Sequence, residues 1–535
     1  MIFRFKKKSL NQFKELFGKI KDAEYVFDLI NLYFKNNDDK NLNDTISERT
    51  CQDLDFEELF MFLDRTTSKP GQQFLYNQLR STPSNISFTQ DEEIIDELTG
   101  NNSIFEMQYE LSKLANDDAY HIASLFHDKQ PQAPSWFKIA QFSPLVVIVC
   151  LILFPFIPVF LFILFTIIIS NFVIHYWNKK NLIHYSASIP QLIKLKECAT
   201  LLYSYPALKN INNDILESVK VINNINKQMF LFQLETKIQG EFQALFWFII
   251  EIFKICFLLE PIILFNVSKQ LKSKRKDIKK IFDFVGKVDS LISISSLRYG
   301  LESFCKPQIE NNSNLVAENI YHPLINQCIS NNIDVKNSSV LLTGSNMSGK
   351  TTFIRSIGIN VLTGLTINTC FAKKACFPQF QIHSAIRISD DLLNSKSYYY
   401  EEVQTIHSMI NKSTLGHNLF LLDEIFKGTN TVERIASGKA VLSYLASNNN
   451  LVFVSTHDIE LADLLKDEYE LYHFCESIDN GSIHFDYQLK QGPLQNRNAI
   501  RILEINNYPK SIIEEAFSIS RESDLRHQKI LSYNK

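Results

Sequence analysis

Residues 340–353 read VLLTGSNMSGKTTF, and the rest of the sequence is understood most easily from this stretch. An aliphatic run ends in Gly344, four residues follow, and Gly349, Lys350 and Thr351 then lead into residues with helical spacing. This order predicts a strand, a glycine-rich loop and a helix. In the pattern G-x-x-x-x-G-K-T, backbone N–H groups surround a β-phosphate, the lysine reaches the β and γ oxygens, and the threonine holds Mg²⁺. The stretch therefore predicts a nucleotide-phosphate site, with a chance glycine-rich turn as the alternative.

Two further apolar runs end in residues that suit phosphoryl transfer. Residues 418–424, NLFLLDE, end in Asp423, expected to complete the Mg²⁺ shell, and Glu424, expected to polarise the attacking water. Residues 451–456, LVFVST, lead to His457, which is suited to sensing the γ-phosphate. Since buried parallel strands present their chemistry at their carboxyl ends, the three runs predict one ATP-hydrolysing P-loop α/β domain that binds ATP and Mg²⁺. The residues expected around the phosphates are Gly344, Asn346, Met347, Ser348, Gly349, Lys350, Thr351 and Thr352.

Three segments, GSNMSGKTTF, LLDEIFKGTNTVER and VSTHDIELADL, resemble the nucleotide motifs of the MutS family of DNA mismatch-repair ATPases in order and spacing. The Asn346-Met347 pair, the Gly-Thr-x-Thr loop after the carboxylates and the Thr-His-Asp triplet distinguish them from generic P-loop sequences. The resemblance implies a head-to-tail ATPase dimer of the ABC type, in which Ser397 reaches the γ-phosphate of the partner subunit. It thus implies Glu424, His457 and Ser397 as catalytic residues, and Thr351 and Asp423 as the metal ligands.

The resemblance extends upstream, where residues 54–83 look like the start of the family's helical core and residues 242–298 like its closing helices. Apolar spacing in the first of these segments predicts two helices broken at Lys69-Pro70-Gly71. Two departures from the family matter. We expect no mismatch-reading or connector domain before residue 50, and a membrane hairpin interrupts the helical core.

The membrane hairpin is predicted from residues 139–174, which form 36 consecutive positions without a charge. One helix of that length would measure about 54 Å, against about 30 Å for a hydrocarbon core. Pro155 and Pro158 divide the run into arms of 19 residues, Trp136–Phe154 and Val159–Trp177, with a tryptophan at each outer end. Flanking lysines predict that both ends lie in the cytoplasm. The alternative is a buried core hairpin of a soluble protein.

Residues 242–265 are also very apolar but contain Glu251, Lys254 and Glu260. Because a charge at mid-bilayer costs a few kcal/mol, a long core helix is favoured over a third span. Residues 269–280, KQLKSKRKDIKK, carry seven basic residues and one acidic residue. They suit DNA phosphates or anionic lipid, and a solvated helix face explains them equally well.

The overall composition excludes few classes of fold or function. The formal net charge of −3 predicts that any nucleic-acid surface is a local patch. Nine cysteines without C-x-x-C spacing predict reduced thiols and a cytosolic setting for the soluble parts. The predicted fold class is a helical core and lever domain, interrupted by a transmembrane helical hairpin and followed by an ABC-type P-loop α/β ATPase domain. The predicted domains are an N-terminal helical lead (1–50), a helical core in two parts (51–135 and 179–310), the hairpin (136–178), the ATPase domain (311–520) and a tail (521–535).

Three functions remain open on these observations. The first is a homodimeric DNA-binding ATPase at the cytoplasmic membrane that opens and closes helical arms around DNA, recognising DNA structure instead of mismatches. The second keeps the ATPase but gives it a protein or membrane partner. The third, a transport-type ABC ATPase, is disfavoured because the sequence has no LSGGQ-like signature and one hairpin is too little membrane for a pathway.

Overall fold

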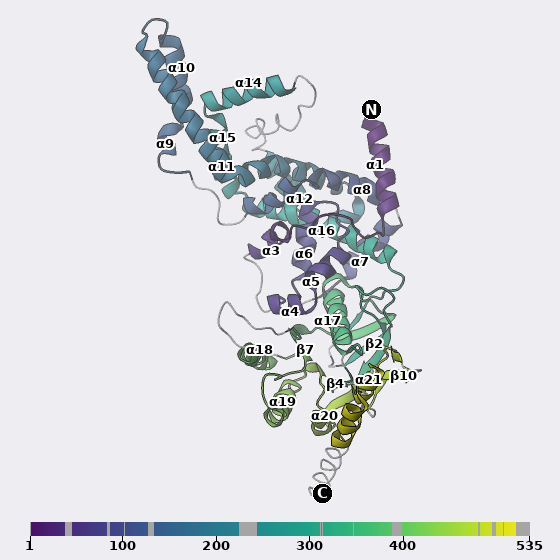
Figure 1. The fold of residues 1–535 in the computed structure, drawn as a ribbon. Helices are drawn as coiled ribbons and strands as arrows, with labels where there is room; N and C mark the ends of the chain where they lie inside the picture. The colour runs from purple at the N-terminus through teal and green to yellow at the C-terminus, as the bar shows by residue number, and fades with distance from the viewer. Residues whose placement is uncertain are drawn as a thin grey trace. The chain divides into compact units, whose positions relative to one another are not determined.

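The computed structural model describes residues 2–37, 45–82, 86–100, 102–126, 133–223, 243–310, 312, 314–336, 338–345, 347–387, 398–414, 416–479, 482–494, 499–506 and 508–520. The chain forms two compact units. The first takes residues 1–40, 60–80 and 87–301, and the second takes residues 41–59, 81–86 and 302–535. The first is helical and the second mixes helices with sheets, so the expected pairing of helical and α/β parts is present (Figure 1).

The first unit is built around the long helix α16 (Arg275–Gly300), which is buried along most of its length. Helices α6, α7, α11 and α12 pack against α16. The other helices of this unit surround these, and α1 packs on α8. The shorter elements are α1 (Ile2–Leu16), α2 (Phe27–Ile30), α3 (Leu32–Lys35), α6 (Lys69–Leu79), α7 (Thr89–Thr99), α8 (Ser103–Leu111), α12 (Ile215–Asn223) and the 3₁₀ segments η2 (Ser112–Leu114), η3 (Asp117–Leu125) and η4 (Pro206–Ile211).

The start of α6 corrects one expectation from the sequence. Lys69-Pro70-Gly71 does not separate two helices but forms the first turn of α6, while α5 (Phe56–Leu63) has already ended. Proline is tolerated there because the first N–H groups of a helix have no partner within the helix. The buried carboxylate of Asp289 accepts hydrogen bonds from the Ser68 backbone N–H at 2.7 Å and hydroxyl at 2.6 Å. A Cβ on Gly71 would lie 2.0 Å from that carboxylate, so glycine is required.

The expected hairpin of two equal arms is also corrected. Its first arm is broken into α9 (Phe137–Ala140) and α10 (Ser143–Leu153), with Pro144 in the first turn of α10. At 1.5 Å per residue, the 11 residues of α10 measure only about 16 Å. The second arm belongs to a longer helix, α11 (Val159–Leu202), which has a non-helical residue at Leu182. Helices α10 and α11 pack together through Val147, Cys150 and Leu164.

Within the described residues, a single helical segment, residues 159–182, is both long and apolar enough to cross a bilayer. Only 17% of its most apolar window is buried, in contrast to the core helix of a soluble protein. The region that the sequence presents as a long core helix, residues 242–265, is instead divided between α14 (Gln243–Cys256) and α15 (Leu259–Lys272). Leu258, at φ +48°, lies between the two helices and immediately precedes α15.

The second unit contains a six-stranded sheet of order β12-β9-β4-β8-β7-β6, parallel except for β12. Beside it lies a four-stranded sheet of order β1-β5-β2-β3, and β10 pairs with β11. The first sheet comprises β4 (Ser339–Thr343), β6 (Gln381–Ala385), β7 (Asn418–Asp423), β8 (Leu451–Ser455), β9 (Tyr469–His473) and β12 (Lys490–Gln491). The other strands are β1 (Gln308–Glu310), β2 (Leu315–Ile320), β3 (Asn331–Val335), β5 (Lys374–Pro378), β10 (Glu476–Asp479) and β11 (Ser482–Phe485).

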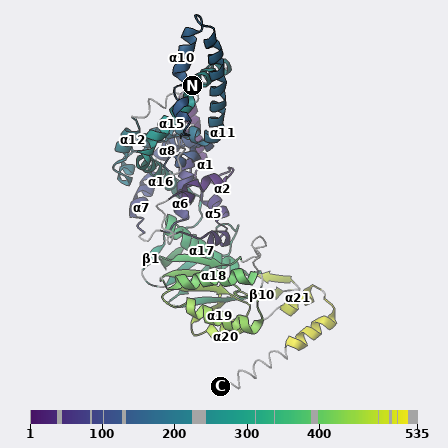
Figure 2. The same cartoon turned by 90° about the vertical axis from the view of Figure 1, so that its left-hand side faces the viewer.

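Helices cover both faces of the six-stranded sheet (Figure 2). Helix α17 (Lys350–Ile367) packs against β7 and β8 and also against β2, which explains why nearly all of its residues are buried. On the other face, α18 (Tyr398–Ser413), α19 (Thr431–Leu445) and α20 (Ile459–Leu465) share one apolar core with β7 and β8. Burial on both faces is why these strands read as continuous apolar runs. A short helix, α21 (Ala499–Ile505), follows the last strand.

Helix α4 (Glu48–Asp53) belongs to the second unit, although the sequence places residues 51–59 with the helical core. The buried carboxylate of Asp53 accepts hydrogen bonds from the Ser384 hydroxyl at 2.6 Å and from the backbone N–H groups of Ile386 at 3.0 Å and Arg387 at 2.8 Å. These contacts hold α4 at the end of β6.

Candidate nucleotide-binding site

The phosphate loop joins β4 to α17, in the strand–loop–helix order that the sequence predicts. Two glycines in the loop adopt positive φ, +148° at Gly344 and +107° at Gly349. A Cβ on Gly344 would lie 2.6 Å from the carbonyl oxygen of Phe474, so no larger residue fits. Met347 also has positive φ, and its side chain is 82% exposed. Asn346 lies outside the described residues.

Lys350 is held inside this loop. Its ammonium group donates to the carbonyl oxygens of Gly344 at 2.9 Å and Ser345 at 2.8 Å. Burial lowers the pKa of Lys350, and the nearby carboxylates of Asp423 and Glu424 oppose that shift. The ammonium group is therefore already placed by the backbone that would surround a phosphate.

Strand pairing brings the predicted metal ligands together. Thr351 Oγ1 donates to Asp423 Oδ2 at 2.9 Å, and the Ser455 hydroxyl donates to the other oxygen of the same carboxylate. Asp423 and Ser455 are register partners in neighbouring strands, which explains their contact. A hydroxyl beside a carboxylate at the end of a phosphate loop is the donor set that Mg²⁺ prefers in P-loop proteins, so these residues fit the ion. The sequence did not single out Ser455, because only the register places it.

The carboxylate of Glu424 lies between the side chains of a histidine and a lysine. Its Oε1 is 2.8 Å from Nε2 of His457, and its Oε2 is 2.7 Å from Nζ of Lys427. The hydrogen bond with His457 is the main cause that lowers the pKa of Glu424 to about 2, and burial opposes it. Both oxygens are thus engaged, and His457 reaches the site through this contact.

The turn that carries Glu424 is strained and supported from behind. Glu424 and Phe426 have φ of +49° and +60°, a region that non-glycine residues seldom adopt. The buried carboxylate of Glu402, on α18, accepts a hydrogen bond from the backbone N–H of Phe426. Glu402 therefore fixes the turn that carries Glu424. Ser397, expected to act across a dimer, lies outside the described residues.

A cavity of about 600 Å³ adjoins these residues, within the size range of small-molecule sites. Its polar part includes Lys350, Thr351, Asp423 and Glu424. Its apolar lining comes from Ile320, Ile325, Ile329, Phe474 and Tyr487. Ser348, Gly349 and Thr352 also line the cavity. The sequence offered no signal for the apolar residues, since they come from separate strands and loops.

The two strand-end loops are tied to each other by an ion pair. The guanidinium of Arg434, on α19, makes two contacts of 2.8 Å with the carboxylate of Asp458, next to His457. Helix α19 begins at Asn430, whose side chain accepts a hydrogen bond from the Glu433 backbone N–H at 3.0 Å. The ion pair and this cap therefore connect the Gly-Thr-x-Thr loop, through α19, with the histidine loop.

Comparison with known proteins agrees with this geometry. Residues 340–524 match the family model described as MutS domain V. The chain is 29% identical over 290 residues to the DNA mismatch repair protein MutS of Listeria welshimeri, a match that covers 52% of this chain and 33% of that protein. The MutS proteins of Geobacillus sp. and Staphylococcus haemolyticus are 28% and 26% identical, covering 49% and 48% of this chain and 31% and 30% of their own length.

The match therefore spans about one third of the length of these curated relatives and about half of this chain. The match with the family model, over residues 340–524, includes the phosphate loop, the paired carboxylates and the strand-end histidine described above. The chain is thus similar to MutS proteins over about half of its length, and its residues 340–524 match MutS domain V.

Proposed function

We propose that this chain is an ATP hydrolase of the MutS type that works from a membrane surface. The observation that carries the hydrolase is the Thr351–Asp423 contact of 2.9 Å beside Glu424 in one cavity. Hydrolysis of a phosphoanhydride depends mainly on positioning and charge stabilisation, and this arrangement provides both.

Each residue has a role that follows from its place. Lys350 and the loop backbone bind the phosphates. Thr351 and Asp423 would hold Mg²⁺, which would supply positive charge to the phosphoryl oxygens. Glu424 orients and polarises the attacking water once its ion pair with Lys427 opens. The apolar residues that line the cavity, such as Ile325 and Tyr487, suit the flat face of adenine.

The hydrolase is tested with Lys350→Ala in the detergent-solubilised full chain. We expect loss of binding of a fluorescent ATP analogue and loss of phosphate release, because the loop loses its buried cation. Lys373, an exposed lysine in the same unit, gives the matched control Lys373→Ala. Phosphate release that survives Lys350→Ala would exclude this site as the hydrolase.

The family resemblance supports DNA as the ligand of the helical unit, which would open and close with nucleotide state in a dimer. DNA structure, recognised through phosphate contacts and deformability, is the proposed target. The alternative is a membrane or protein partner, which the exposed apolar surface of α10 and α11 favours.

Binding to matched, mismatched and branched DNA, with ATP or ADP and over a salt series, separates the two. A DNA ligand predicts a steep salt dependence that changes with the nucleotide. Equal, weak binding of all DNAs regardless of nucleotide would reject DNA in favour of the other partner.

Attachment to a membrane is proposed from the outer surface of α10 and α11. Exposed residues there are mostly large and apolar; they include Leu145, Ile148, Ile152, Val159, Phe162, Phe165, Ile169, Phe172 and Val173. An apolar surface of this kind is unfavourable in water and favourable among acyl chains. We place both ends of the hairpin, and the ATPase unit, on the cytoplasmic side of the cytoplasmic membrane, because lysines flank the hairpin.

A further inference from the structure

The charged side chains of helix α14 are buried, whereas several of its large apolar side chains are exposed. Phe248, Ile249, Ile252 and Phe253 are 59%, 57%, 44% and 56% exposed. Their spacing places them on one stripe of the helix. Glu251 and Lys254, on the opposite side, are buried. A surface helix of a soluble protein has the reverse arrangement, so the outer stripe of α14 suits an apolar medium.

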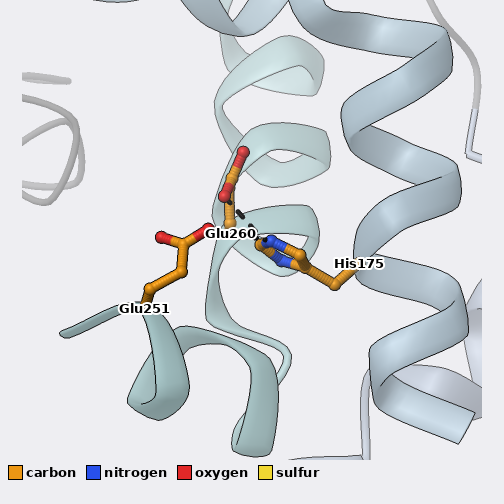
Figure 3. A group of neighbouring side chains, drawn as sticks. All are labelled: His175, Glu251 and Glu260. Carbon is orange, nitrogen blue, oxygen red and sulfur yellow. Dashed lines mark hydrogen bonds and ion pairs between the residues drawn. The ribbon is translucent and has the colours of Figure 1, made fainter. Parts of the chain in front are cut away.

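The buried charges of α14 join it to two neighbouring helices (Figure 3). Nε2 of His175, on α11, is 3.3 Å from Oε1 of Glu251, and Nδ1 is 3.8 Å from Oε2 of Glu260 on α15. His175 and the two glutamates also have the spacing of a cation site. However, Lys179 and Lys254 lie 3.2 and 3.6 Å from Glu251 and balance its charge. The cluster therefore connects three helices through a charge-balanced network.

The apolar arm is the segment of α11 formed by residues 159–182. Helix α14 contacts it far from Val159, near its other end. Asn171 Nδ2 donates to the carbonyl oxygen of Cys256 at 2.8 Å, and His175 and Lys179 contact Glu251. His175 is 16 residues beyond Val159, which corresponds to about 24 Å of helix. A hydrocarbon core is about 30 Å thick, so this level is close to its boundary.

Two tryptophans mark the same level. The rings of Trp136 and Trp177 lie 5.4 Å apart, one from each arm of the hairpin. Tryptophan is enriched where acyl chains meet headgroups. In Figure 1, α14 runs across the direction of α10 and α11 instead of alongside them. Its 14 residues measure about 21 Å, too short to cross the core.

We propose that α14 is an interfacial membrane helix. It lies in the headgroup region of the surface from which α10 and α11 enter the bilayer, with Phe248, Ile249, Ile252 and Phe253 among the upper acyl chains. Interfacial helices of this kind bury their apolar face about 5–10 Å into the boundary. The inference rests on the proposed membrane attachment and adds a second, shallower contact to it, which fixes the depth and rotation of the arm.

The test uses fluorescence of an environment-sensitive label on single cysteines, in the full chain reconstituted into phosphatidylcholine–phosphatidylglycerol vesicles. The four half-buried cysteines, Cys256, Cys305, Cys328 and Cys475, are first replaced by serine. Labels are then placed at Ile249→Cys on α14, at Ile169→Cys near the middle of the arm, and at Val432→Cys. Val432 is 78% exposed on α19 and is the matched control in water. ATP-analogue binding reports folding of each variant, and Phe253→Cys is a second reporter for α14.

We expect labels at Ile249 and Phe253 to be quenched most strongly by lipids that carry a nitroxide near the headgroup. The label at Ile169 should be quenched most strongly by a deep nitroxide, and the label at Val432 by neither. If Ile169 is quenched while Ile249 and Phe253 behave like Val432, α14 faces water and the inference fails, although membrane attachment stands. If Ile169 also behaves like Val432, membrane attachment itself fails. Quenching of Ile249 at the depth of Ile169 would replace the interfacial helix by an inserted one.

Discussion

At the residue scale, the carboxylate of Glu424 is held by two neighbouring side chains. Its carboxylate is bound on one oxygen by His457 and on the other by Lys427, which together hold its pKa near 2. A carboxylate with so low a pKa is a weak base. We therefore expect it to act on water mainly by orientation and charge, and to need the Lys427 contact to open during turnover.

The change Glu424→Gln tests this role directly. The amide keeps the size of the side chain but loses the negative charge, so we expect ATP to bind with affinity within a few fold of wild type. Phosphate release should fall by about 10²-fold or more, the range for a positioned acid–base group. Single-turnover hydrolysis with labelled ATP measures both steps. Turnover close to wild type would remove Glu424 from the catalytic residues.

His322 is a buried histidine in the second unit whose titration affects stability. Burial, with a contribution from Arg355, lowers its pKa to about 4 from an ordinary value of 6.5. Between these values the unfolded chain binds more protons than the folded chain, so the free energy of unfolding decreases as pH falls from 6.5 toward 4. At pH 5.5 this loss is about 1 kcal/mol.

We expect the free energy of unfolding of the wild type, relative to that of His322→Gln, to decrease by about 1 kcal/mol between pH 7.5 and pH 5.5. Only the wild type loses stability through this imidazole. Denaturant unfolding, followed by fluorescence at the two pH values, gives the comparison. His484, on the β10–β11 hairpin and exposed, provides the matched control His484→Gln, for which we expect no such pH dependence. A constant difference between wild type and His322→Gln would show that the pKa of His322 is the same in the folded and the unfolded chain, and would contradict the lowered value.

At the scale of elements, α4 demonstrates how a segment distant in sequence completes the second unit. Asp53 receives three hydrogen bonds from the end of β6, and Asp55 pairs with Arg355 at 2.9 Å on α17. Helix α17 begins with the phosphate-loop lysine, so α4 supports both the sheet edge and the helix behind the site. The apolar pattern of residues 54–63 predicts helix but carries no sign of this partner.

We expect Asp53→Asn to destabilise the second unit by about 1–3 kcal/mol, because buried N–H groups lose a charged acceptor. Chemical denaturation followed by loss of ATP-analogue binding measures the effect. The matched control is Asp22→Asn, since Asp22 is exposed in the first unit. An unchanged unfolding midpoint in Asp53→Asn would mean that the amide oxygen satisfies the same donors equally well.

At the scale of the whole molecule, the exposed apolar surface of α11 is the feature on which the proposed membrane attachment rests. Replacing Phe162, Phe165 and Ile169 by lysine places three charges on the surface of α11, each costing about 2.5–3.5 kcal/mol at the centre of a membrane. We expect the triple variant to separate from vesicles in a flotation gradient while wild type floats. The control places lysines at Val432 and Tyr444, exposed residues of α19. A triple variant that floats like wild type would contradict membrane attachment by this arm.

The proposed dimer is tested by mixing two inactive variants. Ser397→Ala should block hydrolysis in the site of the partner subunit, whereas Lys350→Ala should block binding in its own site. Mixed dimers then contain one site with an intact Lys350 and an intact Ser397 supplied across the interface. We expect about a quarter to a half of wild-type turnover to return on mixing, measured as phosphate release. No recovery, with dimers verified by light scattering, would exclude action in trans.

Features that depend on local spacing along the chain could be predicted from the amino-acid sequence. The phosphate loop, the apolar strands that end in Asp423 and before His457, and the apolar arm are all readable, because backbone chemistry and burial on both faces leave short, regular patterns. The contacts between distant residues are visible only in the folded chain. Strand register brings Ser455 to Asp423, Asp53 binds the end of β6, and the buried Glu251 of α14 contacts His175. These contacts join segments up to 334 residues apart, and no local pattern records a partner that only folding brings near.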